Sequence, residues 1–324
     1  MNRFSDSSPY DGPVGFLEGV PRGAAGLTVD RHQCDAFAAP PRRTARGAPA
    51  WRRGSRGNCL ERIRRKSSAW PRVFDPHGIA ARRLGENVYE LLVIDHGGGE
   101  AVERLSVDTA GKRPVIVEGD RIVQPPRTSG NALAHMPDGG FVLTSMFDPT
   151  DPDFVSKFAQ GQTTGGVWSW TSGNGWSRFG SLELSGANGI AATLDGSAVY
   201  VSEWSARRIW RLGSGGEPVG HAQTSFLPDN LRWTSDGKLL LAGQASRPEL
   251  MFGCEARGEP YPLAFEVAVV DPDTMMLESQ VRADERQAKA WGFGGATGAL
   301  EVDGELWVGS FTGERIAKFR RRSP

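Results

Sequence analysis

The strongest constraint on the fold is a repeated unit, which is clearest at residues 185–212. A corner of small residues at 186–189 leads into an apolar segment, and Asp195-Gly196 then supplies a tight hairpin turn. Residues 199–203 alternate in the manner of a half-buried strand, and residues 208–212 follow as another strand. This stretch therefore predicts a small sheet in which each strand is joined to the next by a tight turn.

The same unit recurs along the chain, aligned on Asp-Gly turns at Asp138, Asp195, Asp236 and Asp303. The copies are separated by roughly 40 to 70 residues, in and beyond the range of propeller blades. A sheet of three or four strands cannot bury both faces alone, whereas sheets stacked around an axis bury them and protect their edges. The repeats predict an all-β propeller. A β-sandwich is the alternative, but its strands would not repeat the corner motif.

The N-terminal segment does not follow this pattern. From residue 40 it is rich in Arg, Pro, Ala and Gly, and its apolar residues have neither a strand nor a helix period. We expect residues 1–71 to be an irregular Arg/Pro-rich segment, a degenerate or incomplete first blade, and residues 72–324 to form the propeller domain. A basic arm for an anionic partner, a poorly packed surface segment and an aberrant sequence all remain open for residues 1–71.

Composition narrows the choice of partners and location. Lys plus Arg and Asp plus Glu each number 38, so the net charge of zero gives no argument for nucleic acid. No stretch approaches the roughly 20 apolar residues of a membrane span, and the N-terminus lacks the pattern of a secretory signal. We expect a cytoplasmic protein with neither a nucleic-acid nor a membrane partner. Cys34, Cys59 and Cys254 have no metal or redox spacing and are expected to be free thiols.

The corners of the repeat carry the residues that point to chemistry. In a propeller, the loop before each innermost strand faces the central channel, and the corners here carry amides and one carboxylate: Asn131, Asn188, Asp229 and Asn230. Hard oxygen ligands of low total charge suit Ca²⁺, which takes about six to eight oxygens. Asn and Asp also stabilise turns through local hydrogen bonds, which is the alternative explanation. Their recurrence at one position of the repeat favours a calcium site.

Two histidines are candidates for catalysis. His77 occupies a corner like those of the asparagines, and His96 ends a predicted strand and is followed by three glycines. A single histidine at a strand end is most often structural. A pair beside a calcium ion can instead activate an attacking water, because imidazole titrates near neutral pH.

The motifs around these residues resemble the paraoxonase branch of the senescence-marker-protein/gluconolactonase superfamily. They are H-G-I from His77, L-L-V-I-D-H ending at His96, G-N-A-L with Asn131, A-N-G-I-A-A-T-L-D-G with Asn188, and P-D-N-L with Asp229. The resemblance extends over residues 76–319. It implies a six-bladed β-propeller with a catalytic calcium in the channel, in a family whose members hydrolyse lactones, some esters and organophosphates.

Carried over by position, the resemblance implies that calcium is held by Asn131, Asn188, Asp229 and Asn230. It also implies that His77 and His96 form a water-activating pair. The sequence departs from the family in two places. Residues 1–71 contain no Glu-Asp pair that could supply the usual glutamate ligand, and Ala132 stands where paraoxonases have an aspartate for a second calcium. We expect the second calcium to be absent or weak, and the first to be bound less tightly, because Asp229 is its one charged ligand.

Taken together, these features predict a calcium-dependent hydrolase of small-molecule lactones or esters. The metal would polarise the substrate carbonyl while the histidine pair activates water. The alternative is a catalytically inactive propeller that binds a ligand or partner at the channel mouth, because the fold alone does not decide function. Condensation chemistry of the strictosidine-synthase type is less well supported by the asparagine and aspartate set. The sequence does not specify an oligomeric state.

Overall fold

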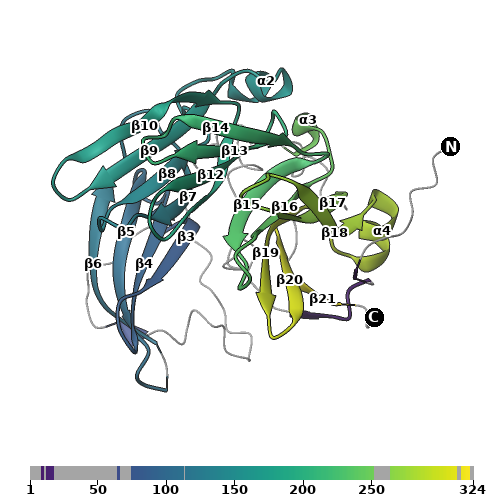
Figure 1. Ribbon diagram of the computed structural model, residues 1–324, viewed down its shortest axis with the longest axis horizontal. Helices are drawn as coiled ribbons and strands as arrows, with labels where there is room; N and C mark the ends of the chain where they lie inside the picture. Colours follow the sequence, from purple (N-terminus) through teal and green to yellow (C-terminus); the bar gives the residue numbers. More distant parts are fainter. Residues whose placement is uncertain are drawn as a thin grey trace, which may run out of the picture.

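The computed structural model describes residues 9–10, 12–17, 64–65, 74–112, 114–251, 263–311 and 315–321. These residues form five sheets that follow one another in an arc around a common axis (Figure 1). The predicted all-β propeller is confirmed. The predicted number of six blades is wrong, because the described chain builds a five-bladed propeller.

Each blade is an antiparallel meander in which successive strands lie farther from the axis. Two blades also carry one strand from the N-terminal segment at the outer edge. The first contains β3 (Pro76–Arg83), β4 (Val88–Asp95), β5 (Ala101–Asp108) and β6 (Val115–Val123). The second contains β7 (Gly130–His135), β8 (Phe141–Ser145), β9 (Gly165–Thr171) and β10 (Gly175–Leu184). The third contains β11 (Ala187–Ala192), β12 (Ala198–Glu203), β13 (Arg208–Gly213) and β14 (Pro218–Gln223).

The fourth blade contains β15 (Leu227–Trp233), β16 (Leu239–Gln244), β17 (Phe265–Val270) and β18 (Leu277–Ala283). The fifth contains β19 (Ala296–Val302), β20 (Glu305–Ser310) and β21 (Ile316–Arg320). The N-terminal β1 (Gly15–Leu17) pairs with β21 and completes this last blade, while β2 (Arg64–Arg65) pairs in parallel with β6.

The placement of β1 and β2 explains the error in the number of blades. The sequence shows four corners, at His77, Asn131, Asn188 and Asp229-Asn230, and the Asp303-Gly304 turn of a fifth unit. The sixth blade was expected from the family resemblance in the N-terminal segment. The two described strands of that segment add to the outer edges of other blades and form no sheet of their own. The predicted domain boundary at residue 71 lies outside the described residues, as do Cys34, Cys59 and Cys254, so these expectations stay predictions.

The predicted Asp-Gly hairpins are present in the structure. In the third blade, Gly196 has a φ of 70° and donates its N–H to the carbonyl of Thr193, which closes the turn between β11 and β12. Hydrogen bonds from Thr193 and Ser197 to the Asp195 carboxylate lower the pKa of Asp195 to about 2. The aspartate therefore stabilises the turn as a hydrogen-bond acceptor, and the glycine supplies the left-handed backbone conformation.

Every innermost strand contains a β-bulge near its start. Pairing with the second strand of the blade slips by one residue between Pro76 and Ile79, Gly130 and Leu133, Ala187 and Ile190, Pro228 and Leu231, and Ala296 and Gly298. The residues inside the bulges are His77-Gly78, Asn131-Ala132, Asn188-Gly189, Asp229-Asn230 and Thr297. A bulge re-aims the side chains that it contains. The corner motif of the sequence is therefore the same irregularity repeated in all five blades.

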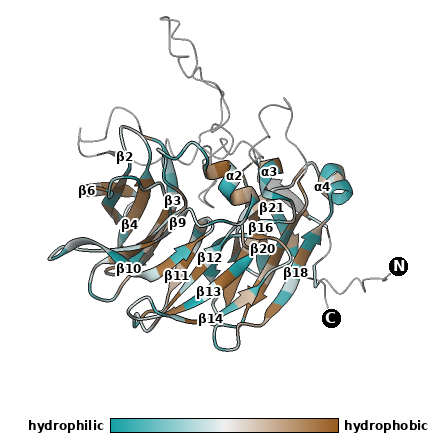
Figure 2. Ribbon diagram, turned by 90° about the horizontal axis from the view of Figure 1, so that it is seen from above, coloured by the Kyte–Doolittle hydropathy of each residue, from teal (hydrophilic) through white to brown (hydrophobic). Residues whose placement is uncertain are grey.

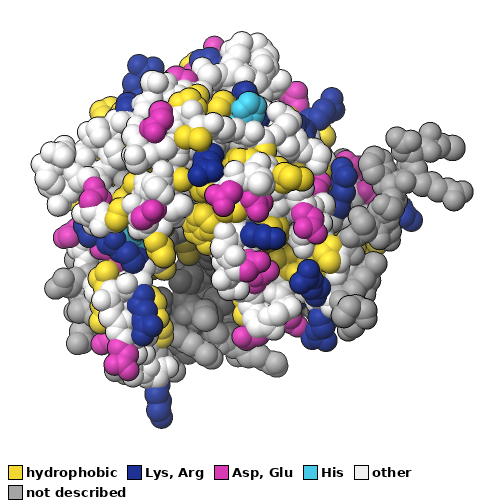
Figure 3. Space-filling model, in the orientation of Figure 1, with side chains coloured by type: hydrophobic (Ala, Val, Ile, Leu, Met, Phe, Trp, Pro, Cys, Tyr) yellow, Lys and Arg dark blue, Asp and Glu magenta, His cyan; other side chains and the backbone are white. Residues whose placement is uncertain are grey.

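Apolar side chains fill the space between neighbouring blades, and the innermost strands pack against one another in the order β3, β7, β11, β15, β19. Between the second and third blades, for example, Val142 and Val167 pack against Ile190 and Val199. Burying each such side chain stabilises the fold by about 1.5–3 kcal/mol. Figure 2 shows hydrophobic residues along the strands, and Figure 3 shows acidic and basic side chains interspersed on one face of the molecule.

Two short helices, α2 (Phe154–Ala159) and α3 (Pro248–Met251), lie side by side at one edge of the sheets (Figure 2). Their residues Phe158 and Met251 join a buried cluster with Met146 and Trp204. A third helix, α4 (Glu285–Trp291), has an N-terminal capping box at Asp284. None of the helices in the described chain has the length and apolarity to cross a membrane. The cluster at α2 and α3 reaches the bulges through Met146, whose Sδ accepts from Asn131 Nδ2 at 3.7 Å.

Candidate functional site

The five bulges bring the predicted site residues to one end of the innermost strands. Gly78 lies so close to β7 that an added Cβ would stand 2.1 Å from the Asn131 carbonyl oxygen. Gly189 approaches β15 in the same way, with 2.2 Å to the carbonyl oxygen of Asp229. The amide nitrogen of Asn230 then donates to the carbonyl of Thr297 in β19, at 2.8 Å. Corners that are far apart in the sequence are therefore neighbours in space.

Three buried amide oxygens at these corners have no hydrogen-bond partner. They belong to Asn131, Asn188 and Asn230, whose exposed fractions are 2%, 0% and 2%. In Asn188 the amide nitrogen is unpartnered as well. The orientation of Asn230 is determined by its nitrogen, which donates to Asp229 Oδ1 at 2.7 Å and to a backbone carbonyl. Buried polar groups normally find partners, so three unpartnered oxygens at neighbouring bulges need an explanation. Asn131 and Asn188 occupy the first position of their bulges, whereas Asn230 occupies the second, after Asp229.

Asp229 supplies the one carboxylate of this group of corners, and neighbouring amides fix its orientation. Its Oδ1 accepts from Asn230, and its Oδ2 accepts from Gln244 Nε2 at 2.8 Å. The Gln244 oxygen accepts in turn from Trp204 Nε1 at 2.9 Å, and both Gln244 and Trp204 are completely buried. This chain of hydrogen bonds holds the Asp229 carboxylate beside the asparagines.

The donor set fits a hard cation such as Ca²⁺. Amide and carboxylate oxygens are the ligands that calcium prefers, and the set contains no sulfur or imidazole that would favour zinc. Nowhere in the described ranges do three or more His, Cys, Asp or Glu side chains gather closely enough to hold a metal ion. A cation at this site would therefore rely on the amide oxygens of Asn131, Asn188 and Asn230, with Asp229 as its charged ligand.

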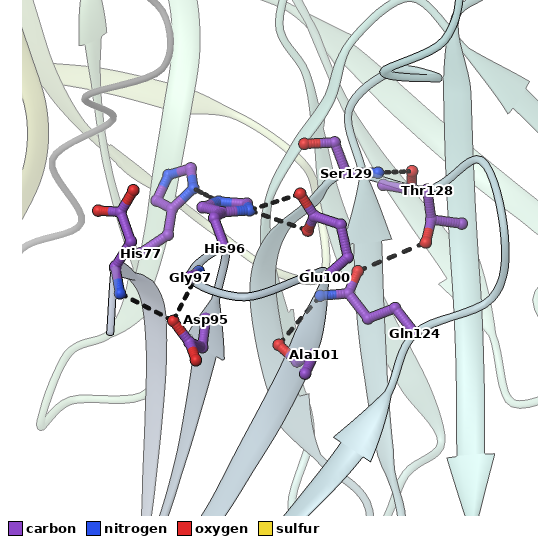
Figure 4. A network of polar contacts seen from close by, with 12 residues as sticks. His77, Asp95, His96, Gly97, Glu100, Ala101, Gln124, Thr128 and Ser129 are labelled. Atoms are coloured by element: carbon purple, nitrogen blue, oxygen red, sulfur yellow. Dashed lines mark hydrogen bonds and ion pairs between the residues drawn. The ribbon is translucent and has the colours of Figure 1, made fainter. Parts of the chain in front are cut away.

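The two predicted histidines are in direct contact on the first blade, next to the corner that holds Asn131. His77 Nδ1 lies 2.9 Å from His96 Nε2, and His96 Nδ1 lies 2.8 Å from both carboxylate oxygens of Glu100 (Figure 4). His77 is 9% exposed, and the His96 side chain is 5% exposed. The three side chains form one continuous hydrogen-bonded relay.

The turn that carries His96 is anchored by a buried ion pair. Asp95 is completely buried, and its Oδ1 accepts from the Gly97 N–H at 2.8 Å (Figure 4). Arg121 pairs with Asp95 Oδ2 at 2.6 Å and donates to the carbonyls of Gly97 and Gly99. Burial tends to lower the pKa of Arg121, but hydrogen bonds to Asp95 and Glu103 outweigh it and raise the pKa. The guanidinium therefore stays charged and holds the turn in place.

Glu100, Gln244 and Thr297 are site residues that the sequence analysis missed. Glu100 is signalled by the H-G-G-G-E spacing, since three glycines allow the chain to turn the carboxylate back onto His96. Thr297 occupies the fifth copy of the corner motif, in the place of the asparagines. Gln244 ends an otherwise apolar strand, and a polar residue directly after L-L-L-A-G was the available signal.

His135, to which the sequence assigned no role, lies at the opposite end of β7 from the bulge. Burial lowers the pKa of His135, and the positive charge of Arg82 adds to this effect. Burial tends to raise the pKa of Glu90, yet its ion pairs with Arg104 and Arg82 hold that pKa below the ordinary value. These residues form a structural network away from the candidate site.

No protein-family model matches the chain, and no curated protein matches it. Solved structures that resemble it include a gluconolactonase from Xanthomonas campestris, with 18% identity, a TM-score of 0.47, and coverage of 76% of this chain and 72% of that one. A luciferin-regenerating enzyme has 12% identity, a TM-score of 0.46, and coverage of 75% and 76%. A streptogramin B lyase has 11% identity, a TM-score of 0.45, and coverage of 76% and 65%. At these values the likeness carries no argument about activity, which must come from the site itself.

Proposed function

We propose that this protein hydrolyses small lactones or esters with the help of a bound calcium ion. The observation that carries the proposal is the set of three buried amide oxygens without partners, gathered with Asp229 at the corners next to the histidine relay. An unsatisfied buried polar group costs about 1–3 kcal/mol. A single cation would satisfy all three oxygens at once, and Asn131, Asn188, Asn230 and Asp229 are the residues that would hold it.

When bound, the ion supplies polarisation of the substrate carbonyl and stabilisation of the negative charge that develops on its oxygen. The histidines supply the base. Glu100 has no proton to donate when it is ionised, so His96 Nδ1 must donate to it, and His96 Nε2 then accepts from His77 Nδ1. With both imidazoles neutral, His77 is then protonated on Nδ1, and Nε2 is its basic nitrogen. This nitrogen can take a proton from an attacking water.

The proton balance of the reaction follows from this arrangement. The water oxygen attacks the carbonyl carbon as His77 Nε2 takes one water proton, and the bond between that carbon and the ring or ester oxygen then breaks. His77 returns the proton to the departing oxygen, which becomes a hydroxyl group. The products are a hydroxy acid from a lactone, or an acid and an alcohol from an ester. The buried cluster at α2 and α3 supplies an apolar wall at this end of the propeller.

The test is hydrolysis of a panel of lactones and aryl esters by the purified protein, with calcium and with a chelator. Wild-type activity should require calcium. His77→Gln should lose about 10²–10⁴-fold in kcat/KM, the usual contribution of a general base, and Asp229→Asn should need more calcium for the same rate. His221→Gln is the matched control, because His221 lies on the outer strand β14 against Trp210. Folded, calcium-bound protein with no hydrolytic activity would contradict the proposal and favour a binding role.

A further inference from the structure

We infer that Glu100 is a positioning residue, which fixes the tautomer of His96 and thereby makes His77 Nε2 the base. This inference rests on the proposed hydrolysis for its functional meaning. Glu100 is in direct contact with His96, because both of its carboxylate oxygens lie 2.8 Å from His96 Nδ1. A carboxylate in this position accepts a hydrogen bond from one specific ring nitrogen and thereby selects one of the two neutral tautomers.

The backbone of the turn is built to return Glu100 to His96. Gly98 and Gly99 have φ values of 70° and 109°, which side chains other than glycine rarely adopt. The Gly97 N–H and carbonyl are held by Asp95 and Arg121, and the Glu100 carbonyl accepts from the backbone N–H of Gln124 at 3.0 Å. Both ends of the turn are therefore fixed before any substrate binds, and the carboxylate needs no rearrangement to reach the imidazole.

Glu100 also affects the charge that develops during the reaction. When His77 takes a proton, the relay acquires a positive charge that His96 can share through its Nε2. The Glu100 carboxylate lies at the far end of the relay and offsets this charge. An opposite charge within hydrogen-bond distance favours the protonated form of an imidazole. Removing the carboxylate charge should make the relay a weaker base without removing any group that touches substrate.

The first experiment compares the activity of Glu100→Gln and Glu100→Asp with that of the wild type. Glu100→Gln keeps the shape but loses the charge, so we expect kcat/KM to fall by at least about tenfold, part of the 10²–10⁴-fold due to the base. The acidic limb of the pH–rate profile should move to lower pH, because the relay is then less easily protonated. Glu100→Asp keeps the charge and should restore part of the rate. Glu183→Gln removes a carboxylate from the ion pair with Arg178 on another blade, and it should leave kcat/KM and the pH–rate profile unchanged.

A second measurement does not depend on activity. The chain has five histidines, so selective ¹⁵N labelling of histidine with single-site assignment can report the tautomer of each ring. We expect His96 to carry its proton on Nδ1 in the wild type and to lose this preference in Glu100→Leu. A His96 protonated on Nε2 in the wild type would overturn the inference. Unchanged activity and an unchanged pH profile in Glu100→Gln of an active enzyme would overturn it too, whereas an inactive wild type with the expected tautomer would contradict the hydrolase proposal alone.

Discussion

The close approach of the innermost strands makes Gly189→Ala a sharp test of how the site is assembled. The added Cβ would lie 2.2 Å from the Asp229 carbonyl oxygen, 2.7 Å from Asn230 Cα and 2.8 Å from Leu231 N. All three are backbone atoms, which cannot rotate away. Ordinary contact between carbon atoms needs about 3.5 Å, so β11 and β15 must separate by roughly 1 Å.

We expect this separation to cost about 1–3 kcal/mol, as overpacking of a tight interior does. For a domain of this size each kcal/mol lowers Tm by roughly 2–4 °C. Since Asp229 and Asn230 move with β15, calcium affinity should fall as well. Thermal and urea unfolding with and without calcium measure both effects on the same samples.

The matched control is Gly220→Ala, on the outer strand β14 of the same blade. An added Cβ there meets nothing within 4 Å, and its φ lies outside the left-handed region, so the change should alter stability by less than about 1 kcal/mol. If Gly189→Ala unfolds at the same temperature and binds calcium as tightly as Gly220→Ala, the proposed strand contact at the bulges is wrong.

Two further predictions concern residues around the site and at the far end of β7. Burial and the charge of Arg82 lower the pKa of His135, so His135 binds a proton more readily in the unfolded chain than in the folded one. Stability should therefore fall as pH decreases below 6.5, by at most about 1.4 kcal/mol per pH unit, until the folded pKa is passed. In His135→Gln, the unfolding free energy should depend less steeply on pH in this window. Glu90 affects stability only at lower pH, because its pKa lies below its ordinary value. A pH dependence as steep as that of the wild type would contradict this prediction. Gln244→Leu should weaken calcium binding about 10–100-fold, because Asp229 loses the donor that orients it. Calorimetric titration measures this loss, and unchanged affinity would exclude a positioning role for Gln244.

Much of the fold could be predicted from local patterns. The alternation of residues 199–203 and the Asp-Gly turn at Asp195 specify a hairpin through local chemistry alone, and the structure has that hairpin. The count of blades could not be obtained in the same way. It depends on where the N-terminal strands pair, and β1 joins β21 from the other end of the chain, a contact that no local pattern specifies.

The candidate site shows the same division between local and long-range information. The asparagine corners were visible as a repeat, but the extra residue that turns each into a bulge depends on pairing with the second strand. Glu100 was passed over because a carboxylate after three glycines is usually a solvated loop residue. Its role depends on backbone conformations at Gly98 and Gly99 that the sequence permits but does not require. Thr297 lacks the amide or carboxylate that marks most of the other corners, so the residue pattern did not indicate it.

The central claim, that the asparagine corners hold a cation, is tested most directly by comparing wild type with Asn188→Leu in chelator and in calcium. Asn188 is completely buried and neither of its amide atoms has a partner, so leucine removes a penalty of about 1–3 kcal/mol per unsatisfied group. Without calcium the variant should be at least as stable as the wild type. With calcium at 100 times its dissociation constant, the wild type should gain about 2.7 kcal/mol and the variant much less.

The account therefore predicts that calcium raises the unfolding free energy of the wild type by more than that of Asn188→Leu, whichever of the two is the more stable in chelator. Asn174→Leu, in an exposed turn, controls for the change of side chain and should respond to calcium as the wild type does. A wild-type unfolding free energy that is unchanged by millimolar calcium, with Asn188→Leu more stable in every condition, would contradict the claim.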